Sequence, residues 1–201
     1  EDPVRLLRVA RFAAKLNFNI EPNTAKPMMH RAGDLQQVSP PRLFDETLKL
    51  FMSGNGLATF ELLLKYKLFE HIVPQLNPML NDRQGSALKL VRQALTNTDK
   101  RIRSSQRVTP AFIYAALLWP VVDKLAKNYE KNGNSPPYAL SKATGDIIAI
   151  QVPVTAIPKR FTIPMREIWD LQLHLKRRGG NRAKRLTEHS RFRAAYDFIL
   201  L

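Results

Sequence analysis

The 201-residue sequence has no cysteine, which excludes disulfide bonds, a thiolate metal site and a cysteine nucleophile. This absence agrees with the cytoplasmic location that we expect for the protein. No apolar run approaches the roughly 18 residues of a membrane span, and the first residues do not have the pattern of a signal peptide. We therefore expect no membrane span.

Acidic side chains are also scarce, with 17 Asp and Glu against 32 Lys and Arg, a net charge of +15. Much of the excess is concentrated near the end of the chain, where residues 157–195 hold 11 basic and 3 acidic side chains. Such a concentration is typical of proteins that bind a phosphate backbone. An anionic membrane is the competing target, but it requires a basic helix with exposed apolar residues. We expect the aromatic residues here to lie in the core instead.

Two kinds of catalytic signature are missing. There is no Asp-x-Asp or Asp-x-Glu pair of the sort that holds two metal ions, and no glycine-rich phosphate loop. The four histidines are scattered without the spacing of metal ligands. We therefore expect no metal site and no catalytic residue in this chain.

Apolar residues recur at helical spacing throughout, so the sequence predicts an all-α protein with no sheet. Asp2 and Pro3 can cap and begin a helix that ends near Leu16. The spacing predicts one buried face, formed by Leu6, Val9, Ala10, Ala13 and Leu16. A second helix is expected from Pro22, and Ser39 is expected to cap a third. The two prolines and the β-branched residues of 151–158 predict an irregular connection.

The opposite face of the opening helix carries Arg5, Arg8, Arg11 and Lys15. One interpretation is a charged face that is simply solvated. The other depends on Asp2 and Arg5, because a carboxylate beside a guanidinium offers acceptors and donors that can match the Watson–Crick edge of a base. Arg42 has two interpretations as well, either a surface arginine paired with Asp45 or Glu46 or a neighbour of a nucleotide pocket.

Three ordered segments resemble one known family. They are EDPVRLLRVARFAAKL (1–16), SPPRLFDETLKLFMSGNG (39–56) and IPKRFTIPMREIWDLQLHLKRRGGNRAKRLTEHSRFRAAYDF (157–198). The chain resembles the class II template-independent nucleotidyltransferases, which comprise tRNA CCA-adding enzymes and bacterial poly(A) polymerases, and its arginine-rich last segment resembles the latter. The resemblance implies an elongated neck, body and leg arrangement of helices. We expect a neck at 1–56, a helical body at 57–108 and an arginine-rich RNA-binding domain at 109–201.

The resemblance also implies a function, the addition of adenylates from ATP to RNA 3′ ends. Asp2 and Arg5 would read the base, and Arg8 and Arg42 would border that pocket. The expected RNA-binding residues are Arg11, Lys15, Lys159, Arg160, Arg166, Lys176, Arg177, Arg178, Arg182, Lys184 and Arg185. The carboxylates that bind Mg²⁺ would belong to a separate N-terminal head domain. We expect this chain to be a monomeric piece of a longer enzyme, to bind no cofactor by itself and to be inactive alone.

Three alternatives stay open from the sequence. The first is a fragment of a CCA-adding enzyme, because the opening motif is common to both members of the family. The second is a free-standing helical RNA-binding module with no catalytic partner. The third is a basic protein-interaction scaffold, which would bind RNA weakly and without dependence on salt.

Overall fold

The computed structural model describes residues 2–82, 84–175 and 186–201. Within these ranges every regular element is helical and no strand occurs, which confirms the predicted all-α fold. The chain forms two compact units, one of residues 1–108 with 151–157 and the other of 109–150 with 158–201. The expected division into neck, body and leg stays a prediction.

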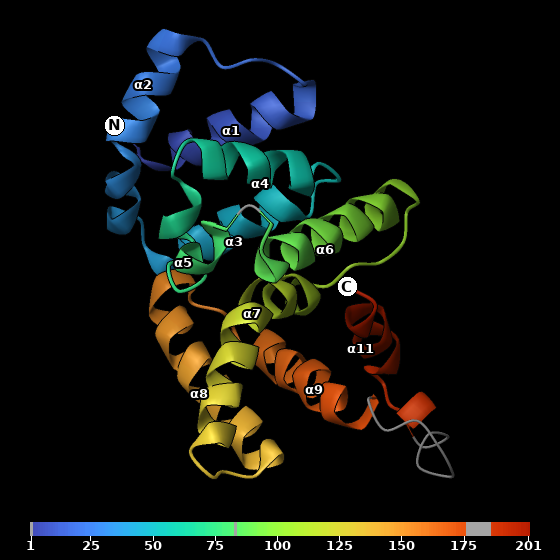
Figure 1. Cartoon of the computed structure of the whole chain (residues 1–201). Helices are drawn as coiled ribbons and strands as arrows, with labels where there is room; N and C mark the ends of the chain where they lie inside the picture. The colour runs from blue at the N-terminus through green and yellow to red at the C-terminus, as the bar shows by residue number, and fades with distance from the viewer. Residues whose placement is uncertain (1, 83, 176–185) are drawn as a thin grey trace. The chain divides into compact units, whose positions relative to one another are not determined.

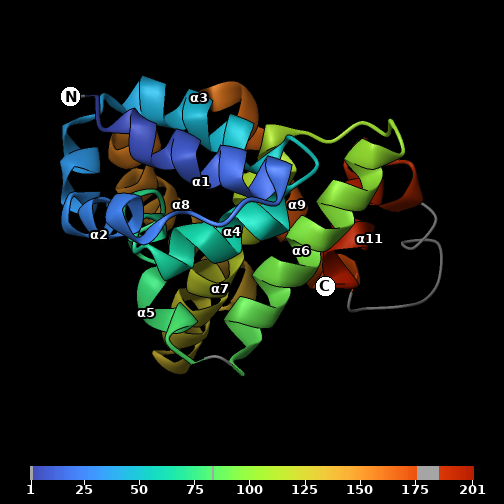
Figure 2. The same cartoon turned by 90° about the horizontal axis from the view of Figure 1, so that it is seen from above.

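The first unit contains most of the short helices (Figure 1). In chain order they are α1 (Val4–Leu16), α2 (Pro22–His30), η1 (Ala32–Gln37), α3 (Pro40–Phe51), α4 (Gly56–Lys65), η2 (Phe69–His71), α5 (Asn77–Leu80) and α6 (Ser86–Arg103). α4 packs against α1, α3 and α6, and α1 also packs against α3 (Figure 2). The position of α1 is therefore set by two neighbours.

The packing of α1 corrects the predicted buried face. The buried residues are Val4, Leu7, Ala10 and Ala13, whereas Leu16 is 51% exposed and Leu6 and Val9 are only half-buried. Apolar residues occur on nearly every side of this helix, so their spacing permits more than one buried face. The positions of α3 and α4 select among them.

The start of α4 is held by a carboxylate from another helix. Gly56 N–H and Leu57 N–H donate to Asp99 of α6 at 2.7 and 3.0 Å, and Asp99 is 4% exposed. A Cβ at Gly56 would lie 3.1 Å from Phe51 O and 3.2 Å from Asp99 Oδ1, so this close approach requires glycine. Asp99 thus satisfies two N–H groups that a helix start leaves without intrahelical partners.

The second unit contains α7 (Pro110–Lys131), most of α8 (Pro136–Thr155), α9 (Lys159–Leu175) and α11 (Phe192–Ile199), whereas the last turn of α8, from Gln151, belongs to the first unit. α9 packs against α7 and α11. The fully buried Trp169 donates from Nε1 to Ala115 O at 3.2 Å, and Gln172 Nε2 donates to Ala195 O at 3.1 Å. These two bonds join α9 to each neighbour.

The end of α8 corrects another prediction. The helix continues through Pro153 to Thr155, where we expected an irregular segment. Gln151, fully buried, donates to Ile72 O and to Thr155 Oγ1, and Gln75 donates to Gln151 Oε1. The bond within α8 and the two tertiary bonds, to Ile72 and from Gln75, stabilise a helical turn that the proline alone disfavours.

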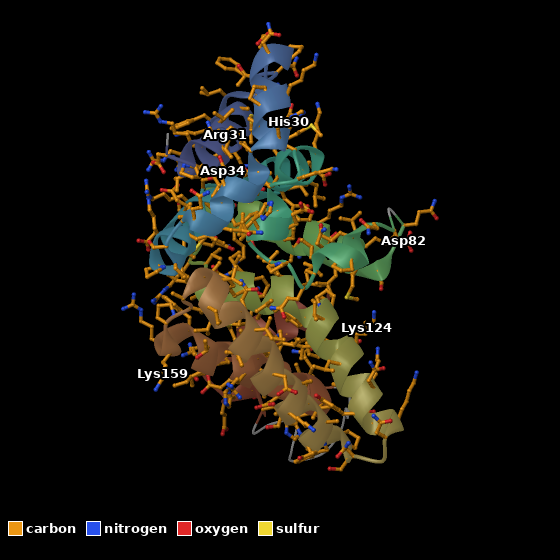
Figure 3. The ribbon with its side chains drawn as sticks, turned by 90° about the vertical axis from the view of Figure 1, so that its left-hand side faces the viewer. His30, Arg31, Asp34, Asp82, Lys124 and Lys159 are labelled. Atoms are coloured by element: carbon orange, nitrogen blue, oxygen red, sulfur yellow. The ribbon has the colours of Figure 1, made fainter. Side chains whose placement is uncertain are left out.

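We predict that Asp99→Ala lowers the free energy of unfolding by about 2–4 kcal/mol, because one buried and one partly buried N–H group lose a charged acceptor. Urea unfolding measures the change. Asp34→Ala is the matched control, since Asp34 pairs with Arg31 at the surface of the same unit at 2.8 Å (Figure 3). The control is expected to cost less than about 1 kcal/mol. Equal losses in the two variants would contradict the capping role.

Candidate nucleic-acid interface

Asp2 lies at the start of α1 and is bound from two sides. Its Oδ1 accepts a hydrogen bond from Val4 N–H at 3.2 Å, and its Oδ2 pairs with Arg42 Nη2, from the first turn of α3, at 2.5 Å. Partial burial acts to raise the pKa of Asp2, but the hydrogen bonds from Val4 and Arg42 outweigh it and the pKa is lowered. Asp2 is therefore an ionised carboxylate in a fixed orientation.

Arg42 forms a different ion pair from the two that the sequence suggested. It pairs with Asp2, 40 residues earlier in the sequence, rather than with Asp45 or Glu46. Arg5 lies one helical turn after Asp2 and is exposed. A carboxylate has about four acceptor positions, so Asp2 keeps acceptor capacity beyond its bonds to Val4 and Arg42. Acceptor and donor groups thus lie near one another at this end of α1.

Glu46 of α3 lies beside this group, and the sequence suggested it only as a possible surface partner of Arg42. Its side chain is 3% exposed and accepts from Arg8 Nη2 at 3.3 Å and from Lys49 Nζ at 2.8 Å. Burial acts to raise the pKa of Glu46, but the bonds from Lys49 and Arg8 prevail and lower it. The sequence contained a signal for this burial, because Glu46 stands between Leu43 and Leu50 on the buried face of α3.

The other predicted cations of the first unit lie further along α1. Arg11 is half-buried and its guanidinium carbon lies 4.8 Å from the centre of the Phe12 ring. Lys15 is exposed in the last turn. The structure therefore brings Asp2, Arg8 and Arg42 together with Glu46, and places Arg11 and Lys15 nearer the opposite end of the helix.

The predicted cations of the second unit lie on α9. Lys159 and Arg160 are exposed in its first turn, where Arg160 lies 5.1 Å from the centre of the Phe161 ring. Figure 3 shows the Lys159 side chain directed outward from the ribbon. Arg166 is half-buried one and a half turns later. The other six predicted RNA-binding residues lie outside the described residues: Lys176, Arg177, Arg178, Arg182, Lys184 and Arg185.

In the part of the chain that the structure describes, no group of three or more His, Cys, Asp or Glu side chains is arranged to hold a metal ion. No helix among these residues combines the length and the apolarity needed to cross a membrane.

The lowered pKa of Glu46 predicts how stability depends on pH. The folded state binds the Glu46 proton less tightly than the unfolded chain does, so this stabilisation is complete above the ordinary carboxyl pKa of 4.5 and is lost as the pH falls through the lower folded-state value. Glu46→Gln should lower the free energy of unfolding by about 1–2 kcal/mol at pH 7. The difference from wild type should shrink below about pH 4, as urea titrations at several pH values would measure. A constant difference down to pH 2 would contradict this assignment.

Two family models match separate parts of the sequence. Residues 17–80 match the one described as "Probable RNA and SrmB-binding site of polymerase A". Residues 132–201 match the one described as "Polymerase A arginine-rich C-terminus". The first match includes Arg42 and Glu46, and the second includes the predicted basic residues of α9.

Comparison with curated proteins extends the similarity over the whole chain. Poly(A) polymerase I of Salmonella typhi is 43% identical over 203 residues, which are 100% of this chain and 44% of that protein. The Haemophilus influenzae protein of the same name is 39% identical over 205 residues, 100% of this chain and 45% of that protein. A CCA-adding enzyme of Actinobacillus succinogenes is 29% identical over 139 residues, 67% of this chain and 35% of that enzyme.

The chain spans less than half the length of the curated poly(A) polymerases that it matches. Similarity to the CCA-adding enzyme is lower and covers only part of the chain. The poly(A) polymerase matches cover every segment that carried the resemblance in the sequence, and both family models describe parts of polymerase A. Over its whole length the chain is therefore similar to bacterial proteins named poly(A) polymerase I, and it contains two regions, 17–80 and 132–201, that match family models of polymerase A.

Proposed function

We propose that this chain is the base-selecting and RNA-binding portion of a template-independent polynucleotide adenylyltransferase, which extends RNA 3′ ends with adenylate from ATP. The observation that carries the proposal is the match of the whole chain to proteins named poly(A) polymerase I. The organisation of charge at the start of α1 supports it, because this is where a nucleotide would be read.

In this proposal Asp2 and Arg5 bind the base of the incoming nucleotide. Arg42 and the N–H of Val4 orient the Asp2 carboxylate before the nucleotide arrives. Fixed donors and acceptors favour one base over the others, because a wrong base leaves partners without hydrogen bonds. Arg8 is held by Glu46 next to this site and contributes positive charge toward Asp2. Selection of one nucleotide then requires no template.

The chemical step is assigned to another part of the enzyme. Mg²⁺ ions held by paired carboxylates would activate the RNA 3′ hydroxyl and stabilise the leaving pyrophosphate. Asp2 and Glu46 do not fit that role, because each is already neutralised by cations. We place the metal ligands in the part of the longer relatives that this chain does not span, and infer that the chain alone binds substrates without catalysing the reaction.

Adenylate addition is favoured over CCA addition by the extent of the matches. The CCA-adding enzyme from Actinobacillus succinogenes aligns with 67% of this chain, whereas the poly(A) polymerases align with all of it. The basic region at 157–195 lies within the match to the arginine-rich C-terminus of polymerase A. An unstructured RNA presents a regular series of phosphates, which such a region can bind.

We predict that Arg5→Ala in the complete enzyme lowers its preference for ATP over CTP by about tenfold to a hundredfold, since a specific base contact contributes roughly 1–3 kcal/mol. The ratio of kcat/KM values for the two nucleotides measures this. Arg107→Ala, which alters an exposed arginine after α6, is the matched control and should leave the ratio unchanged. An unchanged ratio in Arg5→Ala would exclude base reading by Arg5.

We also predict that the 201-residue chain binds single-stranded RNA with a steep salt dependence. Five to seven phosphate contacts would give a slope of log K against log salt of about −3.5 to −5. Lys15→Gln should reduce the slope by about 0.7, whereas Lys124→Gln, at an exposed lysine of α7 (Figure 3), should not change it. Fluorescence anisotropy at several salt concentrations provides the slopes. Weak binding that is indifferent to salt would instead indicate a protein-interaction scaffold.

A further inference from the structure

The end of α1 exposes three large apolar side chains. Phe12 is 49% exposed, Leu16 is 51% and Phe18 is 66%. Phe12 and Phe18 are exceptions to the expected burial of the aromatic residues, many of which do lie in the core. Single exposed apolar residues are common at protein surfaces, but three within seven residues at one helix end form a patch. Such a patch needs a binding partner to explain it.

Basic side chains lie on the same side of α1 as this patch. Phe12 and Leu16 are one turn apart, and Arg5, Arg8 and Lys15 fall on the same side at 100° per residue. The opposite side, with Val4, Leu7, Ala10 and Ala13, is buried against α3 and α4. Phe12 lies seven residues after Arg5, or about 10 Å along the helix axis. One exposed face thus combines apolar rings with positive charge.

Phe18 is exposed despite a local motif that usually buries the residue in its position. Asn17 ends α1 in the left-handed conformation with a φ of 53°, and Phe18 N–H donates to Ala13 O at 2.9 Å. In this type of helix ending, the apolar residue after the left-handed one commonly packs back onto the helix. Phe18 is instead 66% exposed. Its ring is available to a partner.

The charge around the patch favours a polyanion over an apolar protein surface. Residues 3–20 contain four cations and no acidic side chain. The Arg11 guanidinium lies over the Phe12 ring at 4.8 Å, so a cation and an aromatic face are already adjacent. Proteins that hold single-stranded nucleic acid combine such rings, on which bases stack, with cations that contact phosphates. A protein partner would use the apolar rings without requiring this charge.

We propose that Phe12 and Phe18 are base-stacking platforms for single-stranded RNA, with Arg11 and Lys15 contacting its phosphates. The proposal rests on the RNA-binding function proposed above and names the residues that bind bases rather than phosphates. The distance of about 10 Å between Phe12 and Arg5 accommodates about three stacked nucleotides at 3.4 Å each. RNA stacked at the end of α1 would therefore reach the base-reading residues with its 3′ end.

The first test measures the affinity of Phe12→Ala and Phe18→Ala for a fluorescein-labelled single-stranded oligoadenylate. Each substitution should weaken binding by about fivefold to a hundredfold, because base stacking on an aromatic ring contributes roughly that much. The salt slope should stay unchanged, since no phosphate contact is lost. Tyr138→Ala, at a residue of the second unit that is 57% exposed, is the matched control and should bind as wild type does. Circular dichroism checks that each variant is folded.

The second test detects stacking directly. Phe12→Trp places an indole at the patch, and its fluorescence should be quenched when oligoadenylate binds. An RNA of the same length with abasic residues should quench it much less, because it retains the phosphates and lacks the bases. The wild-type protein provides the background from its own tryptophans, Trp119 and Trp169, of which Trp169 is fully buried.

The outcomes separate this proposal from the function on which it rests. If the wild-type chain binds no RNA, or binds it without salt dependence, the proposed RNA-binding function fails. If wild type binds with a steep slope but both phenylalanine variants bind equally well and Phe12→Trp is not quenched, the stacking proposal is overturned and the RNA-binding function stands. The patch would then be assigned to a protein partner.

Discussion

The ionised carboxylate of Glu46 is the constraint on which the candidate site depends. It lies on the buried face of α3 and accepts from both Arg8 and Lys49. A buried charge without partners is strongly destabilising, and Lys49 of the same helix supplies one partner. Arg8 is the partner from α1, so its ion pair with Glu46 favours the register in which α1 and α3 meet. The same register brings Arg42 of α3 to Asp2 at the beginning of α1. One buried group therefore aligns the residues proposed to bind the nucleotide.

The two ends of α1 differ in the charged and apolar groups that they expose. At its first turn, Asp2 is oriented by a backbone N–H and a guanidinium, and the positive end of the helix dipole favours its charge. At its last turn the acidic groups are absent, and cations lie beside exposed aromatic rings. The first arrangement favours recognition of hydrogen-bonding edges, and the second favours flat apolar surfaces next to phosphates. Under the proposals made above, a single helix would contact both the nucleotide and the RNA.

The rest of the first unit holds this helix in place through contacts distant in sequence. α1 packs on α4, and α4 begins at two N–H groups bound by Asp99 of α6. Arg103 of the same helix donates two hydrogen bonds to Gly54 O, whose residue has a φ of +82°. The loop before α4 is thus held by a carboxylate and a guanidinium one turn apart. Glycine at 54 and 56 permits this geometry because a side chain would strain one position and crowd the other.

The sequence by itself determined the helical class and the excess of positive charge, and its ordered motifs indicated the resemblance to polymerase A, because each depends on local spacing, composition or the order of motifs. Only the tertiary structure decided which side of α1 is buried, since its apolar residues surround the helix and α3 and α4 choose among them. It also decided that Arg42 pairs with Asp2, that α8 continues through Pro153, and that Phe12 and Phe18 are exposed. These features depend on residues tens of positions apart or on packing between helices. A pattern read along one segment contains no information about the helix against which that segment will pack.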